Sequence, residues 1–193
     1  MKLTKNPKAE GLIFDLDGTL ADTMPAHYIA WVEVSSANGF VFTEELFYKL
    51  AGTPTFKIVA ILNDMFDKDM DPEVTHEQKE HAFLKQIKTI KPIQSVMDVV
   101  MENYKKIPMS VGTGGVPDVA ALTLQAIGAE KYFDIIITAR DVKNFKPAPD
   151  TFLVCAERMG IAPEKCEVFE DSELGLQAAR SAGMIATDIR PFA

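Results

Sequence analysis

Cysteine is scarce in this sequence, and basic residues are fewer than acidic ones. The two cysteines, Cys155 and Cys166, lack C-x-x-C spacing, so neither a zinc site nor a disulfide framework is indicated. We expect both to be buried free thiols. The chain has 20 basic against 28 acidic residues and a formal net charge of -8. Because no surplus of positive charge is available for the phosphates of nucleic acids or acidic membranes, we expect neither partner.

Long hydrophobic runs, low-complexity tracts and Gly/Ser linkers are also missing. No apolar run has the length of a membrane span, and the opening residues MKLTKNPK lack the apolar core of a signal peptide. We therefore expect a soluble cytoplasmic protein, either a monomer or a weak homodimer. The 193 residues are 47% hydrophobic, which is enough for one domain or for a core with a small insertion.

Apolar periodicity divides the chain into two kinds of structure. From residue 24 to about residue 90 it predicts four helices and no strand. These begin near Met24, Thr43, the Thr53-Pro54 pair and Asp71, and the fourth extends to about Ile90. In the third, Thr53 is the expected N-cap and Pro54 the first helical residue. From residue 91 onward, helices alternate with strands predicted at residues 109–111, 135–138, 167–169 and 185–188.

Strands that are separated by single helices pair in parallel through right-handed crossovers. The sequence therefore predicts an α/β protein with a doubly wound, parallel, Rossmann-like sheet. We expect residues 1–22 and 91–193 to form this core. Residues 23–90 would form an α-helical cap inserted after the first strand.

Two aspartates, Asp15 and Asp17, directly follow the apolar segment at residues 12–14, and Gly18 ends that strand. Alternate residues of a strand share a face, so both carboxylates would lie at the carboxyl edge of the sheet, where open α/β folds bind ligands. Two acids this close repel each other, and a cation such as Mg²⁺ or a shared proton must relieve that repulsion. The alternative is an ordinary turn at the end of a strand.

Three later strand ends also carry polar groups. The Gly112–Gly115 turn, which contains Thr113, could cradle a phosphate before a helix, or be a plain tight turn. Lys146 precedes two prolines that restrict the backbone and help to aim it, although most lysines are solvated. Asp171, after Glu170, could ligate a divalent cation or cap the next helix.

These four segments resemble, in order, the four motifs of the haloacid dehalogenase (HAD) superfamily of phosphatases and phosphomutases. They are D-x-D-G-T, V-G-T-G-G, K-P-A-P-D and V-F-E-D-S-E-L-G, and their spacing covers nearly the whole chain. The last two look particularly like the β-phosphoglucomutase-like subfamily, including its small fructose-1-phosphate phosphatase-type members. A helical insertion between the first two motifs is the cap of that group.

The resemblance implies a role in phosphoryl transfer for each of these residues. Asp15 would be the nucleophile and form an aspartyl-phosphate. Asp17 would protonate the leaving oxygen and then activate the hydrolytic water. Thr113 and the Gly114 N–H would hold phosphoryl oxygens, and Lys146 would steady Asp15 and the developing negative charge.

The resemblance also implies a Mg²⁺ cofactor. A carboxylate oxygen of Asp15, the main-chain carbonyl of Asp17 and a carboxylate oxygen of Asp171 would be its protein ligands. Glu170 would lie behind them and orient metal-bound water.

Substrate selection is expected in the cap. The resemblance places five candidate contacts there: His27, Trp31, Gly52, Thr53 and Lys57. A surface histidine at position 27 and a cap-core tryptophan at position 31 are the alternatives.

One cap position favours hydrolysis over mutase activity. In the mutases, an arginine shortly after a glycine of the cap grips the distal phosphate, and by spacing from Gly52 its place is taken by Thr55. Lys57 would compensate only partly, since lysine lacks the bidentate fork of arginine.

The predicted function is hydrolysis of a small sugar phosphate similar to fructose 1-phosphate, so the expected partner is a small phosphorylated metabolite. The alternative is a β-phosphoglucomutase that interconverts β-glucose 1-phosphate and glucose 6-phosphate. A binding protein on this fold is a third possibility, but the joint presence of Asp15, Asp17, Thr113, Lys146 and Asp171 disfavours it. A true dehalogenase is disfavoured because it has no use for Asp17 or the metal ligands.

Overall fold

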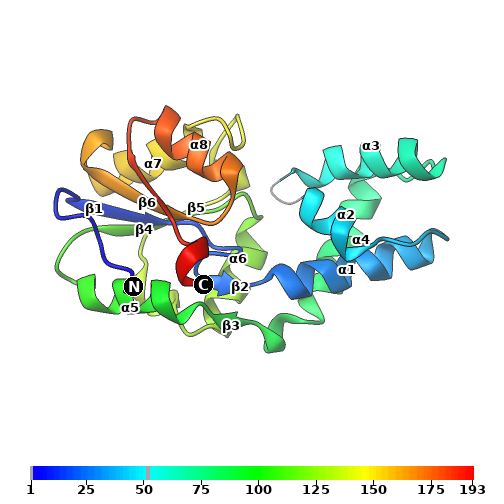
Figure 1. Cartoon of the computed structure of the whole chain (residues 1–193), viewed down its shortest axis with the longest axis horizontal. Coiled ribbons are helices and arrows are strands. Elements are labelled where there is room, and N and C mark those ends of the chain that lie inside the picture. Colours follow the sequence, from blue (N-terminus) through cyan, green and yellow to red (C-terminus); the bar gives the residue numbers. More distant parts are fainter. Residues whose placement is uncertain (1, 51–52) are drawn as a thin grey trace. The chain divides into compact units, whose positions relative to one another are not determined.

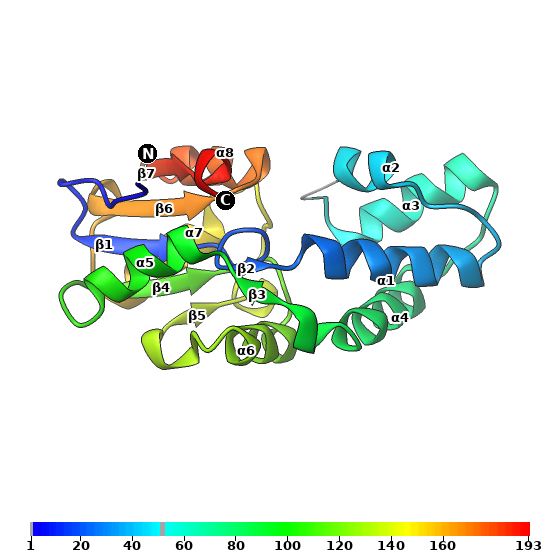
Figure 2. The ribbon, with the colours of Figure 1, turned by 60° about the horizontal axis from the view of Figure 1, so that its bottom comes forward.

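A computed structural model describes residues 2–50 and 53–193 of the chain. Five strands form its main sheet in the order β5-β4-β1-β6-β7, and every neighbouring pair is parallel, as Figure 2 shows. The strands are β1 (Gly11–Phe14), β4 (Met109–Gly112), β5 (Ile136–Ile137), β6 (Cys166–Glu170) and β7 (Ile185–Asp188). The predicted α/β fold with a parallel sheet is therefore confirmed.

Helices cover both faces of this sheet. The connections to β4 and β5 contain α5 (Gln94–Asn103) and α6 (Pro117–Ala126), and those to β6 and β7 contain α7 (Asp150–Met159) and α8 (Glu173–Ser181). Figure 1 shows α7 and α8 on one face and α5 on the other. Buried apolar residues of α7, α8 and the inner strands form one core cluster, which includes Ile13, Phe152, Cys155, Val168 and Ala179.

The strand order fixes where a ligand site can form. After β1 the chain builds the sheet on one side through β4 and β5, then crosses to the other side through β6 and β7. The reversal lies between β1 and β6, where Phe14, the last residue of β1, pairs with Phe169 of β6. Open α/β sheets bind ligands at the carboxyl ends of the strands at such a reversal.

The chain divides into two compact units. One contains the residues up to Asp22 together with Lys91–Ala193, and the other is Thr23–Ile90. The second unit is helical: α1 (Met24–Ala37), α2 (Glu44–Lys49), α3 (Thr55–Phe66) and α4 (Pro72–Leu84). Its core is rich in aromatic rings, and Trp31 stacks on Phe42 with ring centroids 5.6 Å apart.

Two local predictions were wrong, and one pair of short strands was missed. Helix α4 ends at Leu84 rather than near Ile90, because a separate 3-10 turn over Ile87–Thr89 continues the apolar spacing. Pro54, not Thr53, is the N-cap residue of α3, because the Thr53 N–H donates to the Leu50 carbonyl in the preceding turn. The antiparallel pair β2 (Ala21–Asp22) and β3 (Lys91–Pro92) was missed, since two residues are too short for an alternating pattern.

The cysteine prediction is confirmed. Cys155 and Cys166 are free and buried. Burial raises the pKa of the Cys155 thiol to about 12 and that of Cys166 to about 11, so both remain protonated at neutral pH. In the part of the chain that the structure describes, no helix combines the length and the apolar character that a bilayer crossing requires.

Candidate active site

Asp15 is held at the carboxyl end of β1. Its backbone N–H donates to the Phe169 carbonyl at 3.0 Å, which extends the pairing of β1 with β6 by one step. The residue is only 5% exposed. A carboxylate is thus fixed at the reversal of the strand order, with little contact with water.

Lys146 connects two strand ends that are far apart in the sequence. Its ammonium donates to Asp15 Oδ1 at 2.6 Å and to Glu170 Oε2 at 2.7 Å. Burial alone would lower the pKa of Lys146, but the carboxylates of Asp15 and Glu170 outweigh this effect and raise it. The lysine therefore stays charged, and the structure brings it together with Asp15 as expected.

Asp171 lies against the turn that follows Asp15. The Thr19 hydroxyl donates to Asp171 Oδ1 at 2.9 Å. Gly18 has φ +84°, and a Cβ atom there would lie 2.4 Å from Asp171 Oδ2. Only glycine both adopts this conformation readily and leaves room for the carboxylate.

Glu170 is held from the opposite side by the start of α8. Its Oε1 accepts hydrogen bonds from the Ser172 N–H at 2.9 Å and the Ser172 hydroxyl at 2.7 Å. The same hydroxyl accepts from the Gly175 N–H and so caps α8. A Cβ atom on Gly175 would lie 2.1 Å from Glu170 Cδ, so the close approach of Glu170 to the helix requires this glycine.

The glycine-rich turn after β4 faces the second aspartate. Thr113 is buried, and its hydroxyl oxygen accepts from the Gly115 N–H at 2.9 Å, which leaves the hydroxyl proton available for donation. A Cβ atom on Gly115 would lie 3.8 Å from Asp17 Oδ2. Gly114 is exposed, and a Cβ atom there would meet no other atom within 4 Å. The structure therefore brings Asp17, Thr113 and Gly114 to the same edge of the sheet.

The charges at this edge suit a divalent cation. One oxygen each from Asp15, Glu170 and Asp171 lies within 4.8 Å of the others. Burial raises the pKa of Asp15 well above its usual value, and Glu170 adds to this effect while Lys146 opposes it. Burial and then Glu170 raise the pKa of Asp171 to about 7. Carboxylates outnumber the single ammonium, so a hard cation with oxygen ligands would relieve their repulsion.

This arrangement can bind and attack an electrophilic anion. Asp15 offers a carboxylate for attack, and Asp17 is a second acid that could move a proton. Thr113, Gly114 and Lys146 offer hydrogen-bond donors and positive charge. Such groups at one sheet edge suit phosphoryl transfer, in which catalysis is mostly positioning and charge neutralisation.

The predicted cap residues belong to the helical unit. His27 stacks on Phe83 with ring centroids 4.3 Å apart, and Trp31 is buried in the core of that unit. Thr53 is half-buried and Lys57 is exposed. Gly52 lies outside the described residues. Their contact with substrate remains a prediction, although the burial of Trp31 matches the cap-core alternative.

Sequence reasoning missed the residues that support the charged groups. Thr19 orients Asp171, Ser172 orients Glu170, and Gly18 and Gly175 leave room for those carboxylates. A signal for three of them was present, since Gly18 and Thr19 directly follow the aspartate pair and Ser172 stands at a favoured N-cap position. Gly175 is the last residue of the quoted V-F-E-D-S-E-L-G motif, but its role was missed because a glycine within a helix is visible as a packing requirement only in three dimensions.

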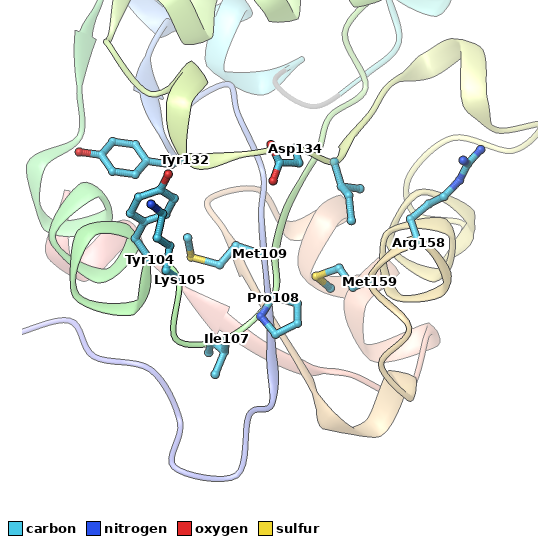
Figure 3. A pocket seen from close by; sticks show the side chains of 10 residues that line it. Tyr104, Lys105, Ile107, Pro108, Met109, Tyr132, Asp134, Arg158 and Met159 are labelled. Atoms are coloured by element: carbon cyan, nitrogen blue, oxygen red, sulfur yellow. The ribbon is translucent and has the colours of Figure 1, made fainter.

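A hollow of about 270 Å³ lies at the opposite edge of the same sheet (Figure 3). Met109 at the amino end of β4 and Met159 at the end of α7 help to line it, together with Tyr104, Tyr132 and Asp134. None of the predicted site residues contributes to this hollow. It is therefore separate from the carboxyl edge where the charged groups meet.

Comparisons with known proteins give independent information on the whole chain. A sequence model of the haloacid dehalogenase-like hydrolases matches residues 12–188. The chain is 42% identical over 181 residues to the fructose-1-phosphate phosphatase YqaB of Escherichia coli (strain K12). This match covers 93% of this chain and 96% of that protein. It is also 34% identical to a phosphorylated carbohydrates phosphatase of Thermotoga maritima, over 91% of this chain and 82% of the other.

Among solved structures, the crystal structure of CbbY from Rhodobacter sphaeroides in complex with phosphate is similar. The TM-score is 0.82 at 25% sequence identity, and the match covers 92% of this chain and 84% of that one. The likeness thus extends over both units of the chain as well as over its sequence.

Proposed function

The chain belongs to the haloacid dehalogenase-like hydrolases and is a phosphoric monoester hydrolase; from this premise we propose that it is a Mg²⁺-dependent phosphatase that hydrolyses a small sugar phosphate similar to fructose 1-phosphate. The observation that carries the proposal is the cluster in which Lys146 binds both Asp15 and Glu170 beside Asp171. The relative at 42% identity, a fructose-1-phosphate phosphatase, supports the choice of substrate class.

Asp15 is the proposed nucleophile. Its carboxylate attacks phosphorus in line with the leaving sugar oxygen, and an aspartyl-phosphate forms as the phosphorus–oxygen bond to the sugar breaks. Asp17 donates a proton to that oxygen, and the neutral sugar leaves. Asp17 then accepts a proton from the water that hydrolyses the aspartyl-phosphate, which regenerates Asp15.

The surrounding donors stabilise the charge on the phosphoryl oxygens during both steps. Thr113 is suited to donate its hydroxyl proton because the Gly115 N–H occupies a lone pair of its oxygen. The Gly114 N–H is placed on the same turn, and the Lys146 ammonium carries a permanent positive charge beside Asp15. Preorganised donors of this kind are among the largest contributions to catalysis.

Mg²⁺ would be held by Asp15, the main-chain carbonyl of Asp17 and Asp171, with Glu170 next to it. When bound, it would neutralise the carboxylates and the charge on a phosphoryl oxygen. The raised pKa values of Asp15 and Asp171 support this assignment, because burial and then the neighbouring Glu170 carboxylate disfavour the ionised forms that a cation would stabilise.

The helical unit is the proposed cap that selects the sugar. His27, Trp31, Gly52, Thr53 and Lys57 are its candidate substrate contacts, and Thr55 in place of the arginine of the mutases favours release of phosphate over its return to the sugar.

The decisive experiment measures phosphate release from fructose 1-phosphate and from a panel of other sugar phosphates and nucleotides. We expect turnover with Mg²⁺, loss of turnover with a chelator, and recovery when Mg²⁺ is restored. Asp15→Asn should lower kcat by a factor of at least about 10,000, because the amide is not a nucleophile. Undiminished turnover by this variant would refute the role of Asp15.

The mutase alternative makes a different product. A β-phosphoglucomutase would form glucose 6-phosphate from β-glucose 1-phosphate and would require priming by a bisphosphate. We expect inorganic phosphate instead. Sustained formation of glucose 6-phosphate without release of phosphate would replace the proposed function by the alternative.

A further inference from the structure

We propose that Phe152 is a positioning residue for the phosphatase reaction: the face of its ring holds the Lys146 ammonium in place through a cation–π interaction. This inference rests on the proposed function, because it gives Phe152 a part in the chemistry of that same site. Phe152 is completely buried in the first turn of α7 and would otherwise be an ordinary core residue.

The geometry places the ring under the charge. The Lys146 ammonium lies over the Phe152 ring, 4.7 Å from its centroid. Cation–π attraction operates within about 6 Å of the ring centroid and is strongest where water is excluded. Lys146 is mostly withdrawn from water, with 13% of its side chain exposed.

The ring completes the surroundings of the ammonium without competing for its protons. A lysine ammonium has three N–H donors. Asp15 and Glu170 each accept a hydrogen bond from it. A third carboxylate at the position of the ring would accept a hydrogen bond from the third N–H of the ammonium. The ring face attracts the positive charge without accepting this hydrogen bond, so the third N–H remains available for a phosphoryl oxygen.

The ring is itself fixed against the neighbouring strand. A Cβ atom on Gly112, the last residue of β4, would lie 3.2 Å from Phe152 Cδ1 and 3.3 Å from Cε1. The missing side chain at Gly112 thus lets the ring approach the backbone one residue before Thr113. Phe152 therefore lies between the strand end that carries the Thr113 hydroxyl and the lysine that holds Asp15.

The test replaces Phe152 by phenylalanines with one, two or three ring fluorines. Fluorination removes negative charge from the ring face while nearly keeping its shape, so an electrostatic role predicts a stepwise loss. We expect kcat for fructose 1-phosphate to fall about twofold per fluorine and KM to change by less than about twofold, in keeping with the modest strength of cation–π contacts. Phe152→Leu should lower kcat at least as much as three fluorines.

The same fluorinated residues at Phe133 are the matched control. Phe133 is a buried ring of the same unit and packs edge-on against Phe14. Its fluorination should leave kcat unchanged. If kcat stays constant through the series at position 152 while the wild-type protein hydrolyses the substrate, the inference is wrong and the proposed function stands. If the wild-type protein releases no phosphate from any substrate, the proposed function itself fails.

Discussion

The two units of the chain are organised by different forces. In the α/β unit, ion pairs and hydrogen bonds connect charged side chains from distant strand ends, as in the contacts of Lys146 with Asp15 and Glu170. In the helical unit, apolar packing dominates, and rings such as Trp31 and Phe42 stack in its core.

This difference indicates a division of labour. At the sheet edge Asp15 and Glu170 are buried and Lys146 and Asp171 are partly buried. Each of these four groups is held by a named partner, which is the condition for positioning a reactive group to within a fraction of an ångström. The predicted contact residue Lys57 of the helical unit is exposed on α3, where Phe56 and Met65 are exposed as well. We therefore expect substitutions in the α/β unit to change the rate of chemistry and those in the helical unit to change substrate preference.

Replacing Lys146 should give the largest effect in this comparison. Lys146→Met removes the ammonium while nearly keeping the length of the side chain, and we expect kcat to fall about 1,000-fold, as for the loss of a preorganised charge-stabilising donor. Phosphate release under saturating substrate measures it.

Lys143 provides the matched control for this variant. It is exposed three residues earlier on the same loop, so Lys143→Met should keep kcat within about twofold, as surface substitutions usually do. Similar losses for the two variants would mean that general positive charge, and not the ion pairs of Lys146, supports the reaction.

Filling the space at Gly175 should give the next largest effect, on stability. Gly175→Ala would place a methyl group against the Glu170 carboxylate, which Lys146 and Ser172 hold in place. We expect the free energy of unfolding in urea to fall by about 3 kcal/mol, as in overpacked cores. Gln177→Ala, at an exposed position of the same helix, should change it by less than about 0.5 kcal/mol.

The carboxylate of Asp171 should make the stability of the metal-free protein depend on pH, and a bound cation should offset this dependence. The pKa of Asp171 is raised from 3.8 to about 7 in the folded protein. Between these values the folded state binds a proton that the unfolded state has lost, so the metal-free protein should lose stability as the pH rises from about 4 to about 7. Below about pH 4 this loss of stability is absent, and above about pH 7 it is complete.

Mg²⁺ should stabilise the protein most where the carboxylates are ionised. At ten times its dissociation constant it should add about 1.4 kcal/mol to the free energy of unfolding, and less at about pH 5, where protons compete for the ligands. Urea titrations with and without Mg²⁺ measure this. Asp171→Asn should abolish the difference, whereas Asp118→Asn, at an exposed position of α6, should preserve it. If Mg²⁺ stabilised the protein equally at about pH 5 and above about pH 7, the result would argue against a carboxylate site.

The sequence allowed the reactive groups to be predicted but not their supports. Asp15, Lys146 and Asp171 follow strands or precede helices of a recognisable α/β alternation, and parallel strands bring their carboxyl ends to one edge. Topology therefore predicted the places of Asp15 and Asp171, whereas the place of Lys146 beside them was implied by the resemblance to the HAD motifs. The place of the Phe152 ring could not be predicted, because the periodicity of α7 shows only that this residue faces the core.

The helical unit was less predictable for a physical reason. Its apolar spacing continues from α4 into the turn at Ile87–Thr89, so the spacing of apolar residues does not show where the helix ends. Contacts with a substrate depend on a few exposed side chains, which no periodicity constrains. The chemistry of the site was thus readable from the sequence to a greater extent than its selectivity.

Lys57 gives the smallest expected effect and the sharpest test of the division of labour. Lys57→Ala should raise KM for a hexose phosphate by about threefold, as for a partly screened surface charge, and leave kcat within about twofold. Lys49→Ala, at an exposed position at the end of α2, is the control and should change neither value. A loss of kcat comparable with that of Lys146→Met would place catalytic charge in the helical unit, and the separation of chemistry from selectivity would then have to be abandoned.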